Sequence, residues 1–404
     1  MDKLPTTNYQ LPTKNRSGFT LTELLVVVAI TAVISAVGFV GLGNYKGRQV
    51  VQSAVDEMSS VIRATRQRSM AQEGGGRWGV HFANATTGIS SYTAFRGYAF
   101  ATGTVDRQYS LPSNISFSNP FASSTYDMVF APLTGAVAAK KVFSVVSGRG
   151  SAPVGDLVVK LNGSTVSRLE SGLVGYWHLD ENTSSTAYDA SGLGNNGTLY
   201  NTSSNICSNP PTAGCPTWWG GTGCKGGGCL GFDGANEYVL MPTAAGNVLK
   251  QQFSQISISA WVYPTSYIAG SYGPTIISNT DSDGWAMRLN NGYLFVDFRL
   301  SGGNVSQVLG SSQVPLSTWT YLAITYDGTN ITGYINGQAV ALVGGSGTMR
   351  NGNTGSCTVI GNEAATCSVP QGSEFPFLGR IDEVRVYNRA LSAAEILSQY
   401  NDLK

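Results

Sequence analysis

One acidic side chain, Glu23, stands at the start of a long apolar run. Leu24 to Gly43 contains no charged residue, and as a helix this run is long enough to cross the roughly 30 Å hydrocarbon core of a bilayer. A lone carboxylate in a membrane segment is costly and usually marks a function. If the chain is cut between Gly18 and Phe19, the new α-amino group lies about one helical turn from Glu23. An amine from a neighbouring subunit then neutralises the carboxylate, which joins apolar helices side by side.

The cysteines form a second group with chemistry of its own. All six lie in the second half of the chain: Cys207, Cys215, Cys224, Cys229, Cys357 and Cys367. An even, clustered set predicts disulfides formed in an oxidising compartment. Cys357 and Cys367 are the expected local pair, since the other four form their own cluster. The alternative is a zinc site made of those four thiolates, but their spacings fit the usual zinc pattern poorly.

The composition excludes several classes of function. The net charge is +1 and charged residues make up 12% of the chain, about half the usual quarter. Nucleic acid is therefore not an expected partner, because binding through bulk charge needs a positive field. Only two histidines are present, His81 and His178, which excludes a metal site built from several histidines. Aromatic residues make up 10%, which argues against a disordered chain.

The N-terminal elements must place Glu23 in a membrane. Residues 1–18 carry three basic side chains and one acid, which predicts a cytoplasmic N-terminus. An ordinary secretory signal has a shorter apolar stretch followed by a small-residue cleavage site, and no such site follows here. Val51, Val55, Met58 and Ile62 recur at steps of four and three, which predicts an amphipathic helix up to Glu73.

The rest of the chain reads as β structure. Short apolar segments separated by Gly, Asn, Ser and Pro predict a small antiparallel β domain over residues 77–170. A second β-rich region begins at Gly172. Its segment 257–263 places Ile258 and Ala260 on one face and Trp261 on the other, so both faces are expected to be covered. This pattern predicts an all-β jelly-roll sandwich.

The N-terminal segment SGFTLTELLVVVAI (residues 17–30) resembles the class III signal of type IV pilins and type II secretion pseudopilins. The resemblance implies removal of residues 1–18 by prepilin peptidase, N-methylation of Phe19 and use of Glu23 in filament assembly. The chain departs from many type IVa pilins in having Val40 where they have Pro. The segments VFAPLTGAV and GDLVVKLNGSTVSRL resemble the FimT and GspH group of minor pilins and pseudopilins.

The second β-rich region resembles the LamG-like jelly roll of the concanavalin A-like lectin/glucanase superfamily. The resemblance rests on YWHLDE (176–181), WTYLAITYDG (319–328) with YINGQ, and IDEVRVYNRALSAAEI (381–396). The E-x-D-x-x-E motif of glucanases with this fold is absent. Asp382 and Glu383 are adjacent, so on a strand they are expected to point to opposite faces and not to act as a facing pair. We therefore expect a binding domain and not an enzyme.

The LamG-like resemblance also implies a Ca²⁺ site built from oxygen ligands. The candidate ligands are Asp180, Asp189, Asn195, Asn196 and Asp382. The alternative is that the Asp and Asn residues serve turns. Glu181 and Asp233 are expected to be exposed loop carboxylates, and His178 to be structural.

Trp218 and Trp219 are the candidate ligand-binding residues. They are adjacent and lie in a polar segment between Cys215 and Cys224, where exposed aromatic rings suit a sugar. The alternative is that both fold back to cover the sandwich.

Together these patterns predict an α+β pilin module followed by an all-β sandwich. The expected parts are a leader (1–18), a transmembrane and assembly helix (19–73), a pilin-like β domain (74–171) and a LamG-like domain (172–404). The predicted function is a minor filament subunit that presents a lectin-like domain for adhesion to an extracellular glycan or protein. The alternative is a pseudopilin of a secretion or DNA-uptake machine whose jelly roll docks partners. Its expected partners are other pilin subunits, prepilin peptidase and the membrane, and it reaches the cell surface after assembly.

Overall fold

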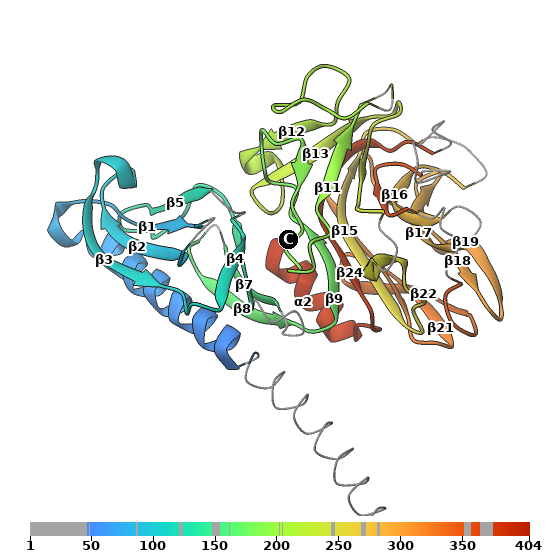
Figure 1. Cartoon of the computed structure of the whole chain (residues 1–404), viewed down its shortest axis with the longest axis horizontal. Helices are drawn as coiled ribbons and strands as arrows, with labels where there is room; N and C mark the ends of the chain where they lie inside the picture. Colours follow the sequence, from blue (N-terminus) through green and yellow to red (C-terminus); the bar gives the residue numbers. More distant parts are fainter. Residues whose placement is uncertain are drawn as a thin grey trace, which may run out of the picture. The chain divides into compact units, whose positions relative to one another are not determined.

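The structure is a computed structural model of the chain (Figure 1). It describes residues 47, 49–85, 88–120, 124–147, 154–160, 162–201, 203, 205–243, 247–267, 272–280, 283–350, 357–363 and 375–404. The predictions for Gly18, Phe19, Glu23 and the apolar run therefore lie outside the described residues. Gly47–Lys404 form one compact unit. Within the described part, the helices lack the combination of length and apolar character that crossing a membrane requires.

The first part of this unit, residues 49–170, is called the helix–sheet module below. Residues 49–70 form a helix, and Val51, Val55, Met58 and Ile62 are all buried on one face of it, as their spacing predicted. Two antiparallel four-stranded sheets complete the module. The first, in the order β3-β2-β1-β5, contains β3 (Thr104–Ser110), β2 (Ser91–Arg96), β1 (Trp78–Ala83) and β5 (Thr125–Phe130). The second, in the order β4-β6-β7-β8, contains β4 (Ile115–Asn119), β6 (Lys141–Ser147), β7 (Val154–Val159) and β8 (Thr165–Glu170).

The core of the helix–sheet module lies between the helix and both sheets. Phe82 of β1 and Phe143 of β6 stack with ring centroids 3.9 Å apart, which joins the two sheets. Both rings belong to the same buried cluster as the apolar face of the helix. Because β strands alternate sides, Val142 and Ser144 on β6 point away from this core.

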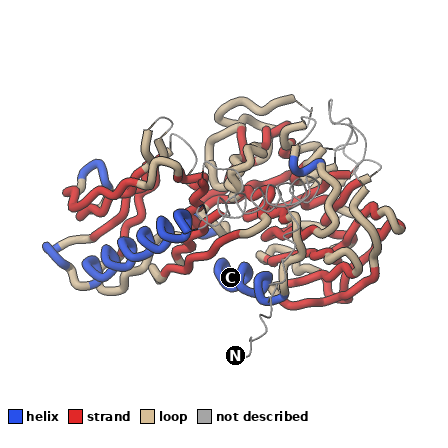
Figure 2. The backbone as a smooth tube through the Cα atoms, turned by 60° about the horizontal axis from the view of Figure 1, so that its bottom comes forward, coloured by secondary structure: helices blue, strands red, loops and turns tan. Residues whose placement is uncertain are grey.

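The second part, residues 172–404, is an all-β sandwich, as predicted, and is called the sandwich domain. Figure 2 shows how strands dominate it. Sheet I, in the order β10-β11-β14-β23-β16-β17-β18-β19, contains β10 (Thr186–Ala187), β11 (Gly197–Tyr200), β14 (Tyr238–Leu240), β23 (Val359–Ile360), β16 (Thr275–Thr280), β17 (Gly284–Asn290), β18 (Tyr293–Leu300) and β19 (Gly303–Gln313). Sheet II, in the order β12-β13-β24-β15-β20-β21-β22, contains β12 (Thr217–Gly220), β13 (Gly228–Asp233), β24 (Leu378–Tyr387), β15 (Ile256–Pro264), β20 (Thr320–Tyr326), β21 (Asn330–Ile335) and β22 (Gln338–Gly344), and β9 (Leu173–Trp177) pairs with β24.

Both faces of β15, in the middle of sheet II, are buried. On β15, Ile258 and Ala260 face the core between the two sheets, whereas Trp261 belongs to a different buried cluster on the outer face. The helix α2 (Ala393–Leu403) covers part of this outer face, and Tyr400 of α2 lies 5.7 Å from the Trp261 ring. The predicted covering of both faces is confirmed.

The helix–sheet module packs against the same outer face. Val142 of β6 and Val158 of β7 share a buried cluster with Tyr176 of β9 and with Trp261. Polar contacts also cross the boundary: Lys140 Nζ donates to Leu403 O at 2.9 Å. The module and the sandwich domain are therefore joined by a buried interface in addition to the chain itself.

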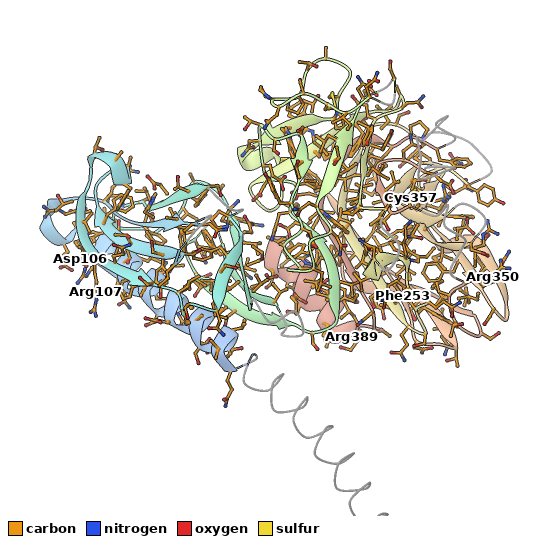
Figure 3. All side chains as sticks on the ribbon, viewed as in Figure 1. Asp106, Arg107, Phe253, Arg350, Cys357 and Arg389 are labelled. Carbon is orange, nitrogen blue, oxygen red and sulfur yellow. A yellow bond between two sulfur atoms is a disulfide. The ribbon has the colours of Figure 1, made fainter. Side chains whose placement is uncertain are left out.

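Arg389 holds the start of α2 beside the end of the module. This side chain, labelled in Figure 3, donates from Nε to Ser171 O at 2.7 Å. Its guanidinium also pairs with Glu395 at 2.6 Å. Glu395 forms a capping box with Ser392, the N-cap residue of α2, so one cation connects the helix start to the junction between the two parts.

A β-bulge on β24 overturns the prediction that Asp382 and Glu383 point to opposite faces. The pairing of β15 with β24 shifts register between Ser259 and Trp261, and Glu383 adopts the left-handed conformation with φ of 53°. Ile381 and Val384 both face the sandwich core. Because a bulge inserts one extra residue, both carboxylates project from the outer face of sheet II. Strict alternation would have held only for a regular strand.

Candidate functional site

A buried cluster of ionisable side chains lies where the helix–sheet module meets the sandwich domain. Its members come from four elements and the segment after β9, and they have at most 8% of their surface exposed: Lys141, Ser144, Asp156, Tyr176, His178, Asp180, Glu181, Asp382, Glu383 and Arg385. Strand β6 contributes Lys141 and Ser144, and β24 contributes the bulged carboxylates. The bulge and the packing of the module together gather these groups, which are far apart in sequence.

His178 links the two parts by hydrogen bonds. Its Nδ1 lies 2.9 Å from Glu383 Oε1, and its Nε2 lies 3.0 Å from Ser144 Oγ. The Ser144 hydroxyl donates to Asp156 Oδ1 at 2.6 Å, so it accepts from His178 Nε2. The order Ser–His–Glu matches that of a hydrolase triad. Here, however, the serine is fully buried and its proton is directed at Asp156, so the arrangement is structural, as predicted for His178.

Glu383 is the anionic centre of this network. Its Oε2 accepts from Tyr176 Oη at 2.5 Å and from Arg385 Nη2 at 2.7 Å. Burial opposes ionisation, but the charges of His178 and Arg385 outweigh it and lower the pKa of Glu383 to about 2. The carboxylate is therefore ionised at neutral pH although it is fully buried.

The pKa of its neighbour Asp382 is shifted in the opposite direction. Asp382 Oδ2 accepts from the backbone N–H groups of Lys225 at 2.7 Å and Gly226 at 3.1 Å. Its Oδ1 is buried and has no hydrogen-bond partner among the described residues. Burial, followed by the charge of Glu383, raises the pKa of Asp382 well above its usual value. A bulge that places two carboxyl groups together thus shifts their pKa values in opposite directions.

Asp180 and Glu181 follow β9 into the same cluster. Asp180 forms an ion pair with Lys141 Nζ, and both side chains are buried. Lys141 Nζ also lies 5.1 Å from the centre of the Tyr126 ring. Glu181 was expected to be exposed, but it is buried, because the preceding Asp180 pairs with Lys141 of the module and Glu181 Oε1 accepts from Tyr188 N. Burial, with the charge of Asp180 adding to it, raises the pKa of Glu181 to about 8.

The remaining calcium candidates lie in the loop before β11. Asp189 Oδ1 accepts from the N–H groups of Tyr176 and Ser191, and its Oδ2 accepts from Ser191 Oγ and Asn195 N. Asn196 Oδ1 accepts from Asp189 N at 2.8 Å. These oxygens serve the loop itself, which is the alternative stated above.

Two of the five calcium candidates, Asp180 and Asp189, already have partners of their own. Asp180 faces an ammonium group, and Asp189 faces N–H and O–H donors. Within the described residues, no three His, Cys, Asp or Glu side chains are grouped as a metal site requires. Calcium binding stays a prediction, and none of the arguments below uses it.

The two candidate ligand-binding tryptophans are separated by strand alternation on β12. Trp218 packs against the sandwich core, and its Nε1 donates to Ser184 O at 2.7 Å. Trp219 points outward and is 44% exposed. The Arg380 guanidinium lies 3.7 Å above the Trp219 ring. One ring therefore covers the sandwich, and the other is partly exposed beside Arg380.

Trp219 and Arg380 line a depression of about 230 Å³ on sheet II. Two acids, Asp233 and Glu237, line it as well. Glu237 Oε2 accepts from Asp233 N at 2.8 Å, and burial raises the pKa of Glu237 to about 7. The depression thus offers an aromatic face, a cation and hydrogen-bonding carboxyl groups within one small surface.

Two disulfides flank the segment that carries these rings. Cys207 bonds to Cys215 and Cys224 bonds to Cys229, so the predicted disulfides of this cluster are confirmed and the four sulfur atoms do not form the zinc site. Cys357 is also disulfide-bonded, and its predicted partner Cys367 lies outside the described residues. Cys215 precedes β12, and the Cys224–Cys229 bond ties the segment after β12 to β13.

Two family models match the chain. The prokaryotic N-terminal methylation motif matches residues 13–39, and the concanavalin A-like lectin/glucanases superfamily matches residues 233–397. The chain joins a prepilin methylation motif to a concanavalin A-like domain. The chain matches no curated protein sequence.

The concanavalin A-like domain is also similar to solved structures. One is domain 4 of AbnA, a GH43 extracellular arabinanase from Geobacillus stearothermophilus, in complex with arabinotriose, with 20% identity, 57% of this chain and 98% of that chain covered, and a TM-score of 0.40. Another is the binding domain of Paraclostridial Mosquitocidal Protein 1, with 15% identity, coverages of 57% and 52%, and a TM-score of 0.38. A botulinum neurotoxin type C structure follows with 16% identity, coverages of 58% and 51%, and a TM-score of 0.38. This chain spans about half the length of these two toxin chains.

Several residues of the buried cluster have no signal in the sequence. Lys141, Ser144 and Asp156 all read as ordinary strand residues. Their roles depend on which outer face of the concanavalin A-like domain the module covers, and no local pattern states this. Arg380 is similar: it reads as an ordinary strand cation until β12 brings Trp219 against it.

Proposed function

We propose that the chain is a minor subunit of a type IV pilin-like filament and that its sandwich domain binds an extracellular glycan. The observation that carries the proposal is the joining of a prepilin methylation motif, residues 13–39, to a sandwich that exposes the Trp219–Arg380 pair. The motif supports processing by prepilin peptidase, anchoring in the membrane before assembly and exposure at the surface afterwards.

The size of the sandwich domain supports a minor role. The domain follows the helix–sheet module directly and is fixed to it by the buried cluster that contains Val142 and Trp261. A rigidly held domain of this size is difficult to repeat at every position of a densely packed filament. A subunit that occurs rarely, or at the filament tip, avoids this crowding.

The depression at Trp219 supports glycan binding. A sugar presents a C–H face that stacks on an aromatic ring and hydroxyl groups that need planar hydrogen-bonding partners. Trp219 supplies the ring, while Arg380, Asp233 and Glu237 supply donors and acceptors beside it. Arg380 also lies 5.1 Å from the Tyr263 ring, so it is held in place before a ligand arrives.

Glycan-array binding of the purified full chain tests the proposal. We expect the wild type to bind at least one glycan, and Trp219→Ala to lose that binding. Tyr98→Ala is the matched control, because Tyr98 is a more exposed aromatic residue, 77%, on the helix–sheet module. No binding by the wild type, with or without added Ca²⁺, would contradict the proposal, and so would release of shortened glycan products.

The same variant separates the adhesin from the pseudopilin. In cells, the adhesin predicts that Trp219→Ala leaves filaments intact and reduces attachment. A pseudopilin whose sandwich docks protein partners predicts instead a loss of secretion or DNA uptake with no change in attachment. Deleting residues 172–404 is a poorer test, since it would expose the apolar residues of β6 and β7 that the sandwich covers.

A further inference from the structure

Lys141 and Asp180 form a buried pair between the two parts of the molecule. Lys141 lies on β6 of the helix–sheet module, and Asp180 follows β9 of the sandwich domain. Their side chains are ion-paired and only 8% and 5% exposed. Burying two opposite charges costs solvation that their attraction only partly restores. A product that removes both charges without moving either backbone would therefore be favoured at this place.

A strip of three glycines closes the pair off from solvent. A Cβ at Gly228 would lie 2.5 Å from Asp180 Cα, and one at Gly226 would collide with Glu383. A Cβ at Gly227 would contact the Lys141 side chain at 3.4 Å. The strip can approach this closely only because it has no side chains. It leaves the amine and the carboxyl group adjacent in a dry, fixed arrangement.

The third component is Asp382. The N–H groups of Lys225 and Gly226, at the start of the glycine strip, hold its Oδ2. Its Oδ1 is buried and has no hydrogen-bond partner among the described residues. Glu383 cannot take the same role, because its oxygens already accept from His178, Tyr176 and Arg385. Asp382 thus has one oxygen left to carry a proton, and a backbone clamp at the start of the glycine strip fixes the other. Glu181 Oε2 is likewise buried without a hydrogen-bond partner among the described residues, so the variants below decide between the two acids.

We propose that Lys141 Nζ and Asp180 Cγ form an intramolecular amide bond that covalently joins the helix–sheet module to the sandwich domain. This proposal is independent of the glycan site.

The reaction is a condensation and needs no oxidant or cofactor. One ammonium proton passes from Lys141 to the Asp180 carboxylate, and the free Nζ lone pair then forms a bond to Cγ. Asp382 gives its proton to the departing oxygen and takes one from the nitrogen, so it ends in its starting state. The Cγ–O bond breaks and one water molecule leaves. An ammonium and a carboxylate thereby become a neutral amide and water, and fixed proximity supplies the advantage over the reaction in solution.

Peptide mapping of the full chain tests the bond. Trypsin does not cleave after an acylated lysine, so after reduction and alkylation the wild type should yield residues 141–149 joined to residues 169–225, lighter than the two peptides together by one water. Lys141→Arg keeps the positive charge beside Asp180 but offers no amine that forms the amide, and it should yield separate peptides. Separate peptides from the wild type, with Lys141 cleaved normally, would overturn the proposal.

Two conservative variants test the role of Asp382. Asp382→Asn keeps an acceptor for the two backbone N–H groups but cannot carry the proton, so unlinked chain should accumulate. Glu181→Gln is the matched control, because Glu181 is a second buried acid next to Asp180, and it should stay linked. Complete linkage in Asp382→Asn would overturn the role of Asp382.

A second readout does not depend on the peptides. A protease site inserted at Asn162, in the turn between β7 and β8, separates Lys141 from Asp180 in the chain. After cleavage, the two fragments of the wild type should stay together on a reducing, denaturing gel, and those of Lys141→Arg should separate. Separation of the wild-type fragments would contradict the amide bond.

Discussion

His178 Nδ1 and Glu383 Oε1 lie 2.9 Å apart, and both side chains are almost fully buried. The contact joins the segment after β9 to the bulge on β24, and through Ser144 it reaches the helix–sheet module. Two strands of one sheet and a strand of another part of the molecule therefore depend on one ionised carboxylate.

The first prediction concerns that carboxylate. Glu383→Gln leaves His178 and Arg385 without their anion, and we expect the free energy of unfolding to fall by about 3–5 kcal/mol, as when one partner of a buried ion pair is removed. Chemical denaturation at neutral pH measures this loss. A change below about 1 kcal/mol would show that the network does not stabilise the fold.

The same residue predicts that the folded chain loses stability at low pH. The pKa of Glu383 is about 2 in the folded chain, below the roughly 4.3 of an unfolded glutamate. Its contribution is therefore fully present above about pH 4.3 and is lost as the pH falls towards 2. Unfolding measured between pH 6 and 2 should show a steeper decline for the wild type than for Glu383→Gln, and parallel curves would contradict the assignment.

Glu181 predicts a pH dependence of stability with the opposite sign. Its pKa of about 8 in the folded chain lies above the unfolded value, so the folded state holds the proton more tightly. The contribution of Glu181 to stability should decline as the pH rises from about 4.3 to 8. Glu181→Gln keeps an acceptor for Tyr188 N and does not titrate. The variant should gain stability over the wild type as the pH rises, and a constant difference between pH 5 and 8 would argue against a protonated Glu181.

The adjacent tryptophans should differ in their effect on stability. Trp218→Ala removes a ring packed on the sandwich core together with its hydrogen bond to Ser184, and should cost about 3 kcal/mol. Trp219→Ala removes an outward-facing ring and should cost about 0.5–1 kcal/mol. Thermal unfolding of both variants checks this, and equal losses would mean that Trp219 packs as Trp218 does.

Reduction of the disulfides should loosen β12. Replacing Cys224 and Cys229 together by serine opens a short loop, and the expected cost is about 2 kcal/mol. Hydrogen exchange should increase on Thr217–Gly220 and remain unchanged on β18, which lies in the other sheet. Increased exchange across both sheets would indicate that the bond supports the whole sandwich.

Processing of the N-terminus is the final prediction. The filament form of the chain should begin at N-methylated Phe19, and Glu23→Ala should reduce its incorporation into filaments while leaving cleavage intact. N-terminal sequencing of surface material and immunodetection of filaments measure the two steps. A surface product that begins at Met1 would contradict the filament proposal.

Local patterns in the sequence were sufficient to predict the helix and the strands. The spacing of Val51, Val55, Met58 and Ile62 predicted the helix face, and alternation around Trp261 predicted a strand covered on both sides, because these periods follow from backbone geometry alone. The clustering of four cysteines between residues 207 and 229 likewise predicted disulfides, since this prediction needs only proximity along the chain.

The sequence by itself determined which strands and helix form, which faces are apolar, and that a prepilin methylation motif is joined to a concanavalin A-like sandwich. Only the tertiary structure decided which side chains meet. A single extra residue in β24 turned Asp382 and Glu383 to one face, and the docking of β6 placed Lys141 against Asp180 and Ser144 against His178. Such contacts join residues far apart in the chain, and their geometry depends on register and packing that no local period encodes.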